Sequence, residues 1–264
     1  PQCGWIQIDE PILCTDMSDS LSETFLETYR SLRKGAPSAR TLLTTYFGSL
    51  GDNLGTALDS ECSGLHLDLC AGNASITDVL TALPEHMSLS LGVVDGHNIW
   101  KTNCASALPV LRNAALKLGN DRLLVGSSCS LLHVPVDLEL ETELDPEIRS
   151  WMAFAVQKCH EIALLGQTID GGWAPECLNE NRLAIESRYL NVKTIDPDVR
   201  RRCRNVTPDM LNRNTPYAVR CGKQEKALNL PLFPTTTIGS YPQTEAIRKA
   251  RREYRKGELS PAAY

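Results

Sequence analysis

Strand-like and helix-like segments alternate five times in the first 166 residues of the chain. Short apolar runs typical of β-strands occur at 5–11, 41–47, 65–69, 89–94 and 123–125. Segments with apolar residues at helical spacing follow them, at 19–34, 52–60, 74–83, 105–118 and 145–162. Because a helix between consecutive strands returns the chain to the same end of the sheet, the strands must be parallel. The pattern predicts an α/β fold.

The segment from Asp145 to Ile162 has the strongest helical pattern in the chain. Asp145 is a good N-cap, and Pro146 is suited to the first helical turn. The apolar side chains that recur at helical spacing are those of Ile148, Trp151, Met152, Ala155, Cys159 and Ile162. The pattern predicts one continuous helix from 145 to 162.

The number of βα units indicates an incomplete barrel. A closed (βα)8 barrel requires about 200 to 250 residues, whereas only five units fit before residue 166. Five parallel strands cut from such a barrel would leave two open edges and an unfilled interior, and a parallel sheet is normally covered on both faces. We therefore expect residues 1–166 to form part of a TIM barrel that belongs to a larger protein.

The pattern changes after residue 166. Residues 167–230 contain Gly171-Gly172 and four prolines among helix-compatible pieces, which is typical of an inter-domain connection. A new start follows in 231–264, with a β-like run from Thr235 to Ile238, a turn at Gly239-Ser240 and a basic helix over 244–256. We expect this last part to be the first βα unit of a second TIM barrel.

Charge is distributed unevenly along the chain. Residues 1–180 carry 10 basic and 24 acidic side chains, whereas residues 181–264 carry 17 basic and 8 acidic ones. A basic segment can bind nucleic acid. No interleaved aromatic residues, zinc-finger spacing or RNA-binding signature accompanies these charges, and docking against an acidic partner accounts for them equally well. We expect no nucleic-acid partner.

The composition also bears on the cellular compartment. No run approaches the roughly 18 apolar residues of a membrane helix, and the first residues have no signal-peptide pattern. The ten cysteines include no C-x-x-C pair and lie mostly in apolar runs. These features predict a cytoplasmic protein with reduced thiols and no membrane partner.

Reactive groups of parallel α/β proteins gather at the carboxyl ends of the strands. Adjacent strand residues point to opposite faces, so Asp9 and Glu10 cannot act together on one substrate, and one of them is expected to be structural. The other polar residues expected at these ends are Tyr46, Asp68, Asp95, His97, Ser127, Ser128 and Cys129.

Four of the residues near these ends are of types that bind zinc: Asp95, His97, Cys129 and His133. Single Cys and His residues in separate βα units are a weak signal, and a buried thiol with hydrogen-bonded histidines accounts for them more simply. No third residue that would orient a Cys/His nucleophilic pair can be identified. We expect no metal ligand and no catalytic residue in this chain.

Four stretches resemble cobalamin-independent methionine synthase, the 5-methyltetrahydropteroyltriglutamate–homocysteine methyltransferase. They are IQIDEP at 6–11, LSLGVVDGHNIW at 89–100, SSCSLLHVPVD at 127–137 and FPTTTIGSYPQT at 233–244. The resemblance implies two (βα)8 barrels joined by a long connection. It implies that residues 1–166 are the second half of the N-terminal barrel, 167–230 the connection and 231–264 the start of the catalytic C-terminal barrel.

The resemblance also implies the chemistry. A methyl group passes from a methyltetrahydrofolate polyglutamate to the homocysteine thiol, which zinc, without cobalamin, holds as thiolate. The implied zinc ligands are a His, two Cys and a Glu that lie beyond residue 264, and the complete protein is expected to be a monomer. The turn Ile238-Gly239-Ser240 is implied to hold the amino-acid part of homocysteine or methionine.

In the N-terminal barrel, the resemblance places Cys129 and His97 where the catalytic barrel has a zinc thiolate and an acid/base histidine. Thr44 to Phe47 replace the His-x-Cys pair, and Leu67-Asp68-Leu69 offers no matching Glu, so a second zinc is not expected. Two other hypotheses remain open: a noncatalytic (βα) scaffold that only holds a partner, and an unrelated barrel enzyme such as a decarboxylase. The TTTIGS run at 235–240 argues against the unrelated enzyme.

Overall fold

The computed structural model describes residues 4–71, 76–172, 174–235 and 243–264, and it divides into two compact units, Pro1–Asp196 and Pro197–Tyr264. The strands of the first unit are β1 (Trp5–Asp9), β2 (Arg40–Thr44), β3 (Gly64–Asp68), β4 (Ser88–Val94) and β5 (Leu123–Ser127). Its helices are α1 (Asp19–Gly35), α2 (Leu54–Asp59), α3 (Ile76–Ala82), α4 (Cys104–Leu118), α5 (Pro146–Ser150), α6 (Ala155–Ile169) and α7 (Pro175–Leu190).

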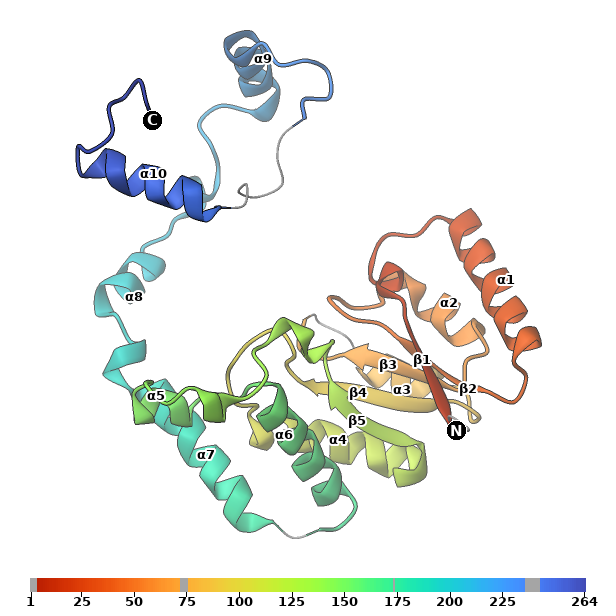
Figure 1. Ribbon diagram of the computed structural model, residues 1–264. Coiled ribbons are helices and arrows are strands. Elements are labelled where there is room, and N and C mark those ends of the chain that lie inside the picture. Colours follow the sequence, from red (N-terminus) through yellow and green to blue (C-terminus); the bar gives the residue numbers. More distant parts are fainter. Residues whose placement is uncertain (1–3, 72–75, 173, 236–242) are drawn as a thin grey trace. The chain divides into compact units, whose positions relative to one another are not determined.

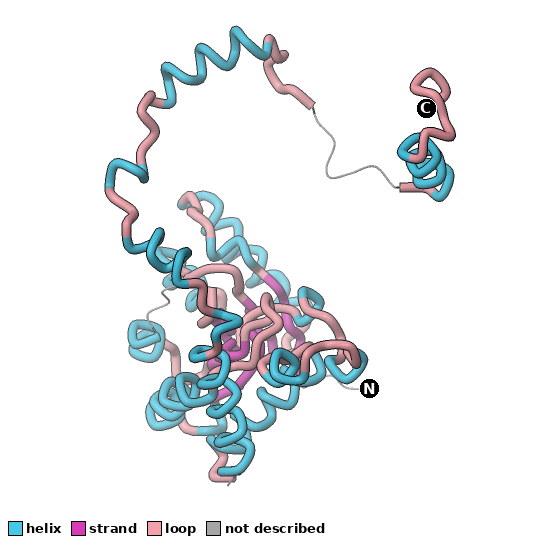
Figure 2. The backbone as a smooth tube through the Cα atoms, turned by 90° about the vertical axis from the view of Figure 1, so that its left-hand side faces the viewer, coloured by secondary structure: helices cyan, strands magenta, loops and turns pink. Residues whose placement is uncertain are grey.

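The five strands form one parallel sheet in the order β1-β2-β3-β4-β5. Figure 1 shows helices α4 and α6 on one side of this sheet, and Figure 2 shows the strands side by side within the first unit. The predicted α/β class with five parallel strands is confirmed. Within the described ranges β1 pairs only with β2, and β5 only with β4, so both edges of the sheet are open.

The two faces of the sheet differ in chemistry because strand residues alternate between them. One face packs under the helices, and its central leucines are at most 2% exposed: Leu43, Leu65, Leu67, Leu89 and Leu91. Burying one such side chain contributes about 1.5 to 3 kcal/mol. On the other face the register places Thr44 beside His66 and His66 beside Ser90. One face is therefore an apolar core and the other is polar.

Side-chain caps set the start of two helices. The Ser18 hydroxyl accepts a hydrogen bond from the Leu21 amide at 3.4 Å at the start of α1. The Asn103 side chain accepts one from the Ser106 amide at 3.3 Å at the start of α4. Each cap satisfies an amide that has no partner within its helix.

The continuous helix predicted over 145–162 is wrong, because two helices, α5 and α6, are separated by residues 151–154. These four residues are all buried, and consecutive residues of one helix cannot all face the same side. They instead run beside the loop after β4: the Ala153 amide donates to the Ile99 carbonyl at 2.8 Å, and the Lys101 amide donates to the Trp151 carbonyl at 2.9 Å.

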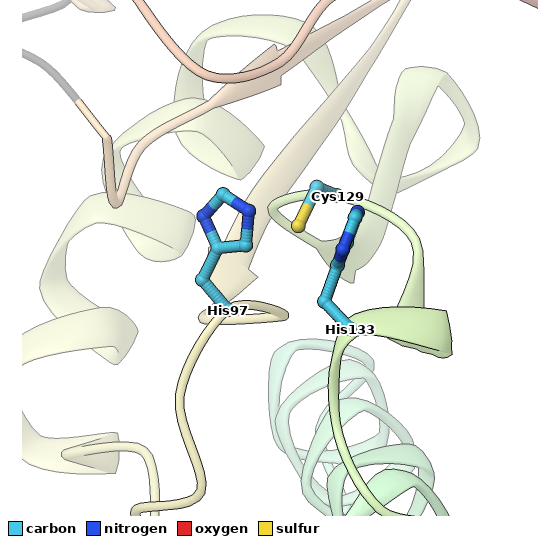
Figure 3. Close-up of side chains that lie close together, drawn as sticks. All are labelled: His97, Cys129 and His133. Carbon is cyan, nitrogen blue, oxygen red and sulfur yellow. The ribbon is translucent and has the colours of Figure 1, made fainter. Parts of the chain in front are cut away.

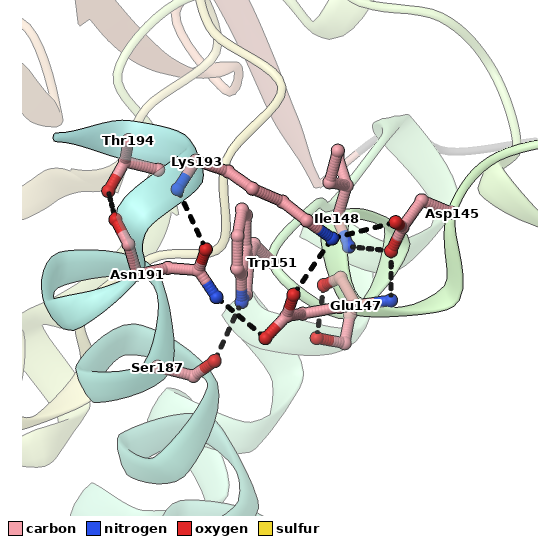
Figure 4. A network of polar contacts seen from close by, with 9 residues as sticks. Asp145, Glu147, Ile148, Trp151, Ser187, Asn191, Lys193 and Thr194 are labelled. Atoms are coloured by element: carbon pink, nitrogen blue, oxygen red, sulfur yellow. Dashed lines mark hydrogen bonds and ion pairs between the residues drawn. The ribbon is translucent and has the colours of Figure 1, made fainter. Parts of the chain in front are cut away.

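A polar network joins α5 to the end of α7 (Figure 4). The Lys193 ammonium lies 2.7 Å from a carboxylate oxygen of Asp145 and 2.9 Å from one of Glu147. The Asn191 amide donates to Glu147 at 2.7 Å, and the Trp151 indole donates to the Ser187 hydroxyl at 3.1 Å. Helix α7, which the sequence places in a connection, therefore packs as part of the first unit.

The second unit contains helices α8 (Pro197–Arg204), α9 (Tyr217–Leu228) and α10 (Glu245–Arg255), none of which has a buried residue. The basic helix predicted over 244–256 is confirmed as α10, with Thr244 as its cap. The β-like run predicted at 235–238 and the turn at 239–240 fall almost entirely outside the described residues. No described helix of either unit has the length and apolar character needed to cross a membrane.

Candidate functional site at the carboxyl ends of the strands

Backbone hydrogen bonds continue the sheet just past its carboxyl edge. The Thr45 amide donates to the His66 carbonyl at 3.2 Å, and the Ser128 amide donates to the Val94 carbonyl at 2.7 Å. A hollow of about 360 Å³ opens between the polar sheet face and this edge. Its polar side chains are those of Gln7, Asp9, Thr44, Tyr46, His66, Ser90, Ser127, Cys129 and Ser130. The sequence-based expectation that polar groups gather at this edge is confirmed.

Asp9 and Glu10 have different environments, as the strand geometry predicts. Asp9 lines the hollow and accepts a hydrogen bond from the Gln7 side-chain Nε2 at 2.8 Å. Glu10 accepts one from the buried Tyr29 hydroxyl at 3.1 Å. Burial, and secondarily the Glu10 charge, raises the pKa of Tyr29 well above its usual range. Glu10 is therefore the structural member of the pair, because it anchors α1 to the sheet.

His66 is buried at the centre of the polar face. Its Nδ1 lies 2.8 Å from the Ser90 hydroxyl, whereas its Nε2 has no hydrogen-bond partner among the described residues. The neighbouring Thr44 hydroxyl is also buried without a partner there. Burial lowers the pKa of His66, so the neutral imidazole is favoured. Unpartnered buried polar atoms are costly, and two of them lie beside each other on this face.

Asp68 organises the loops above β2 and β3. Its carboxylate accepts hydrogen bonds from the amides of Cys70 at 2.8 Å, Ala71 at 2.9 Å and Phe47 at 3.0 Å. Phe47 has a positive φ of 72°, which is uncommon for a residue with a side chain. The hydrogen bond that the Phe47 amide donates to Asp68 holds Phe47 in this conformation, and the Phe47 ring stacks on His97.

His97, Cys129 and His133 lie together, with one possible ligand atom from each within 4.8 Å of the other two. Figure 3 shows the three side chains close together, and the two imidazole rings meet edge-on with centroids 4.9 Å apart. Asp95 is not part of this group: its carboxylate accepts from the His97 amide at 2.8 Å and from the Asn98 side chain. The fold thus unites three of the four residues that sequence spacing treated as separate.

Cys129 is almost fully buried at 5% exposure, whereas both histidines are exposed. Burial raises the pKa of the Cys129 thiol, and the nearby Asp68 carboxylate adds to this effect. A thiol with a raised pKa is protonated at neutral pH and is a poor nucleophile. The environment of Cys129 therefore does not support nucleophilic catalysis.

Lys158 was missed by the sequence analysis. Its side chain is completely buried, and its ammonium donates to the Trp100 carbonyl at 3.0 Å. Burial lowers its pKa, while Glu161, Asp95, Cys70 and Cys129 oppose that shift through their charges. The sequence does indicate that Lys158 is buried, because position 158 falls on the apolar face of α6, the face that carries Leu165.

Ile238, Gly239 and Ser240, the residues predicted to bind homocysteine or methionine, lie outside the described residues. Their role stays a prediction. Residues 233–264 contain no histidine and no cysteine. This segment therefore does not fit a zinc site made from such ligands.

The fold and the polar strand ends define an α/β protein with a site at the carboxyl edge of a parallel sheet. Two family models match the chain: the cobalamin-independent synthase N-terminal domain over residues 1–119 and the cobalamin-independent synthase catalytic domain over residues 233–264. The chain belongs to the cobalamin-independent methionine synthase family.

Two relatives illustrate the similarity. The 5-methyltetrahydropteroyltriglutamate–homocysteine methyltransferase of Caulobacter vibrioides is 45% identical over 262 residues, which are 98% of this chain and 34% of that protein. The protein of the same name from Xylella fastidiosa strain M23 is 46% identical over 261 residues, again 98% and 34%. The chain spans about a third of the length of these curated relatives.

A solved structure, described as the putative vitamin-B12 independent methionine synthase of Listeria monocytogenes, is similar with a TM-score of 0.45 and 15% identity. The similarity covers 65% of this chain and 49% of that one.

Proposed function

We propose that this chain is part of an enzyme that transfers a methyl group from 5-methyltetrahydropteroyltri-L-glutamate to L-homocysteine and so forms L-methionine. The observation that carries the proposal is the 45% identity over 98% of the chain to proteins named for that reaction. The N-terminal and catalytic domain models also match in that order along the chain. The proposed location is the cytoplasm.

The geometry supports a partial (βα)8 barrel for residues 1–166. A parallel sheet is normally covered on both faces, yet among the described residues both edges of this sheet are open and one face is polar. The buried, unpartnered atoms on that face, Thr44 Oγ1 and His66 Nε2, are suited to contacts with further strands. In this proposal residues 167–230 connect the barrels, and 231–264 begin the catalytic one.

The roles proposed for substrate binding follow from the residue types present. Ser240, with the backbone of Ile238 and Gly239, holds the amino-acid part of homocysteine, because a hydroxyl and backbone groups suit an ammonium and a carboxylate. Zinc would bind the homocysteine thiol as a thiolate, and its ligands belong to residues outside 1–264. The reaction uses no cobalamin.

The test compares the 264-residue chain with a longer protein that contains it and has the length of the curated relatives. We expect homocysteine methylation by the longer protein and none by the 264 residues alone. Methylation by the chain alone would contradict the assigned domain division. No methylation by an intact, zinc-loaded longer protein would contradict the proposed activity and favour a noncatalytic scaffold.

The assignment of Ser240 has its own test. In the longer protein Ser240→Ala should raise the KM for homocysteine by about 10-fold, as expected for the loss of a hydrogen bond to a charged group. Ser260→Ala, an exposed serine of the same matched segment, is the control and should leave the KM unchanged. An unchanged KM in Ser240→Ala removes this residue from the binding site.

A further inference from the structure

His97, Cys129 and His133 form a cluster whose ligand atoms all lie within 4.8 Å of one another. In a tetrahedral zinc site, metal–ligand distances of about 2.0 to 2.3 Å place the ligand atoms roughly 3.5 Å apart. The ligand atoms are therefore at most roughly 1.3 Å farther apart than in a coordinated site. Both histidines are exposed, so small side-chain rotations can close this gap.

From this convergence we propose that His97, Cys129 and His133 bind a borderline-soft divalent cation of the zinc class. Two imidazoles and one thiolate are donors that such ions prefer, and three protein ligands leave one position for water. The Cys129 thiol, protonated in the free chain, releases its proton to solvent as the metal–sulfur bond forms. This proposal replaces the sequence-based expectation of no metal in this chain. It does not depend on the proposed methyltransferase function.

The loops around the cluster are shaped to bring its members together. A Cβ on Gly96 would lie 2.8 Å from the Cys129 carbonyl oxygen and 2.9 Å from its sulfur. Only glycine therefore allows the loop that carries His97 to approach Cys129 this closely. Asp95, immediately before, holds that loop through the His97 amide at 2.8 Å.

Phe47 orients both imidazole rings. Its ring lies parallel to that of His97, with centroids 4.6 Å apart at 7°, and meets the His133 ring edge-on at 5.6 Å. Phe47 holds this place with a left-handed backbone conformation. Strained backbone of this kind is concentrated at functional sites. The strain here serves to preset the two histidines.

The ring nitrogens of both histidines make no hydrogen bond within the described ranges and are thus available as ligands. The other possible metal ligands nearby already accept hydrogen bonds. Asp68 accepts three from backbone amides, and Asp95 accepts two. Both carboxylates contribute negative charge close to Cys129, which favours a cation, while the buried Lys158 ammonium contributes a single opposing positive charge. Cys129 also lines the polar hollow, so a bound ion would face that space.

The experiment is a titration of the metal-free 264-residue chain with Co²⁺, followed by displacement with Zn²⁺. We expect one equivalent of Co²⁺ to produce a thiolate-to-cobalt charge-transfer band and the intense visible bands of four-coordinate cobalt, which Zn²⁺ then removes. Cys129→Ser should abolish the charge-transfer band. His97→Ala and His133→Ala should each weaken binding by about 10-fold or more.

Cys159→Ser and His86→Ala change an exposed cysteine and an exposed histidine elsewhere and serve as matched controls that keep the bands. Circular dichroism checks that every variant is folded. The proposal is wrong if no band forms at one equivalent, if the band survives Cys129→Ser, or if the controls weaken it as much as the ligand variants do.

Discussion

A methyl group added at Gly92 tests the close packing that supports the site. Gly92 lies in β4, and a Cβ there would lie 2.7 Å from the Ser128 Cα and 2.9 Å from the Leu67 carbonyl oxygen. Leu67 belongs to β3 and Ser128 directly follows β5, and both atoms are backbone atoms, so they cannot yield as a flexible side chain would. The added Cβ would also lie 2.9 Å from His66 Nε2.

Overpacking of a well-packed interior costs about 1 to 3 kcal/mol, and the backbone contacts at Gly92 place Gly92→Ala in that range. With a urea m-value of about 2 kcal/mol/M, a loss of about 2 kcal/mol lowers the unfolding midpoint by roughly 1 M. Tryptophan fluorescence is a suitable probe, because the four tryptophans, at 5, 100, 151 and 173, all belong to the first unit.

Gly166→Ala is the matched control. Gly166 lies inside α6, and no atom outside its own helix lies within 4 Å of a Cβ built there. Alanine in a helix interior is more favourable than glycine by about 0.5 to 1 kcal/mol, so this variant should unfold at a higher urea concentration than the parent. If Gly92→Ala unfolds at or above the parental midpoint, the packing argument is refuted.

Three further outcomes are expected. Tyr29→Phe removes the hydrogen bond to Glu10 and should lower the free energy of unfolding by about 0.5 to 1.5 kcal/mol in urea titrations. Burial raises the pKa of Glu161, so the folded state favours its protonated form. The contribution of this carboxyl to the free energy of unfolding is complete below the ordinary pKa near 4.3 and is lost as pH rises through the raised value. Glu161→Gln should flatten this dependence in urea titrations between about pH 4 and pH 7. Gly96→Ala should weaken Co²⁺ binding by about 10-fold while circular dichroism stays unchanged.

Each of these outcomes has a result that contradicts it. Equal stability of Tyr29→Phe and the parent would mean that Glu10 does not anchor α1. If the free energy of unfolding of Glu161→Gln changed with pH as steeply as that of the parent, this carboxyl would not prefer its protonated form in the folded state. Unchanged cobalt affinity in Gly96→Ala would mean that the close approach at this glycine does not shape the metal site.

Much of the fold follows from local pattern. The five strands of the sheet coincide with the five predicted apolar runs, and the helix predicted over 105–118 is α4. The helix predicted over 145–162 failed because residues 151–154 bury all four side chains and pair with the Ile99–Lys101 segment. Helical spacing is a local property, so it cannot reveal that residues 151–154 pair with a segment far away in the sequence.

The candidate site was only half visible in the sequence. The polar strand ends were expected from the rule for parallel sheets, and the structural role of Glu10 followed from strand alternation. The buried Lys158 and the stacking of Phe47 on His97 were not expected. Their positions depend on loop conformations and on packing between segments far apart in the chain.

Local chemistry alone determined the α/β class, the parallel order of the strands and the membership of a family, because periodicity and motif are properties of contiguous residues. Only the tertiary structure decided that His97, Cys129 and His133 converge, because the loops after β4 and β5 must close over the same sheet edge before their side chains can meet. It also decided that one sheet face is apolar and covered while the other is polar, since register across strands sorts the side chains.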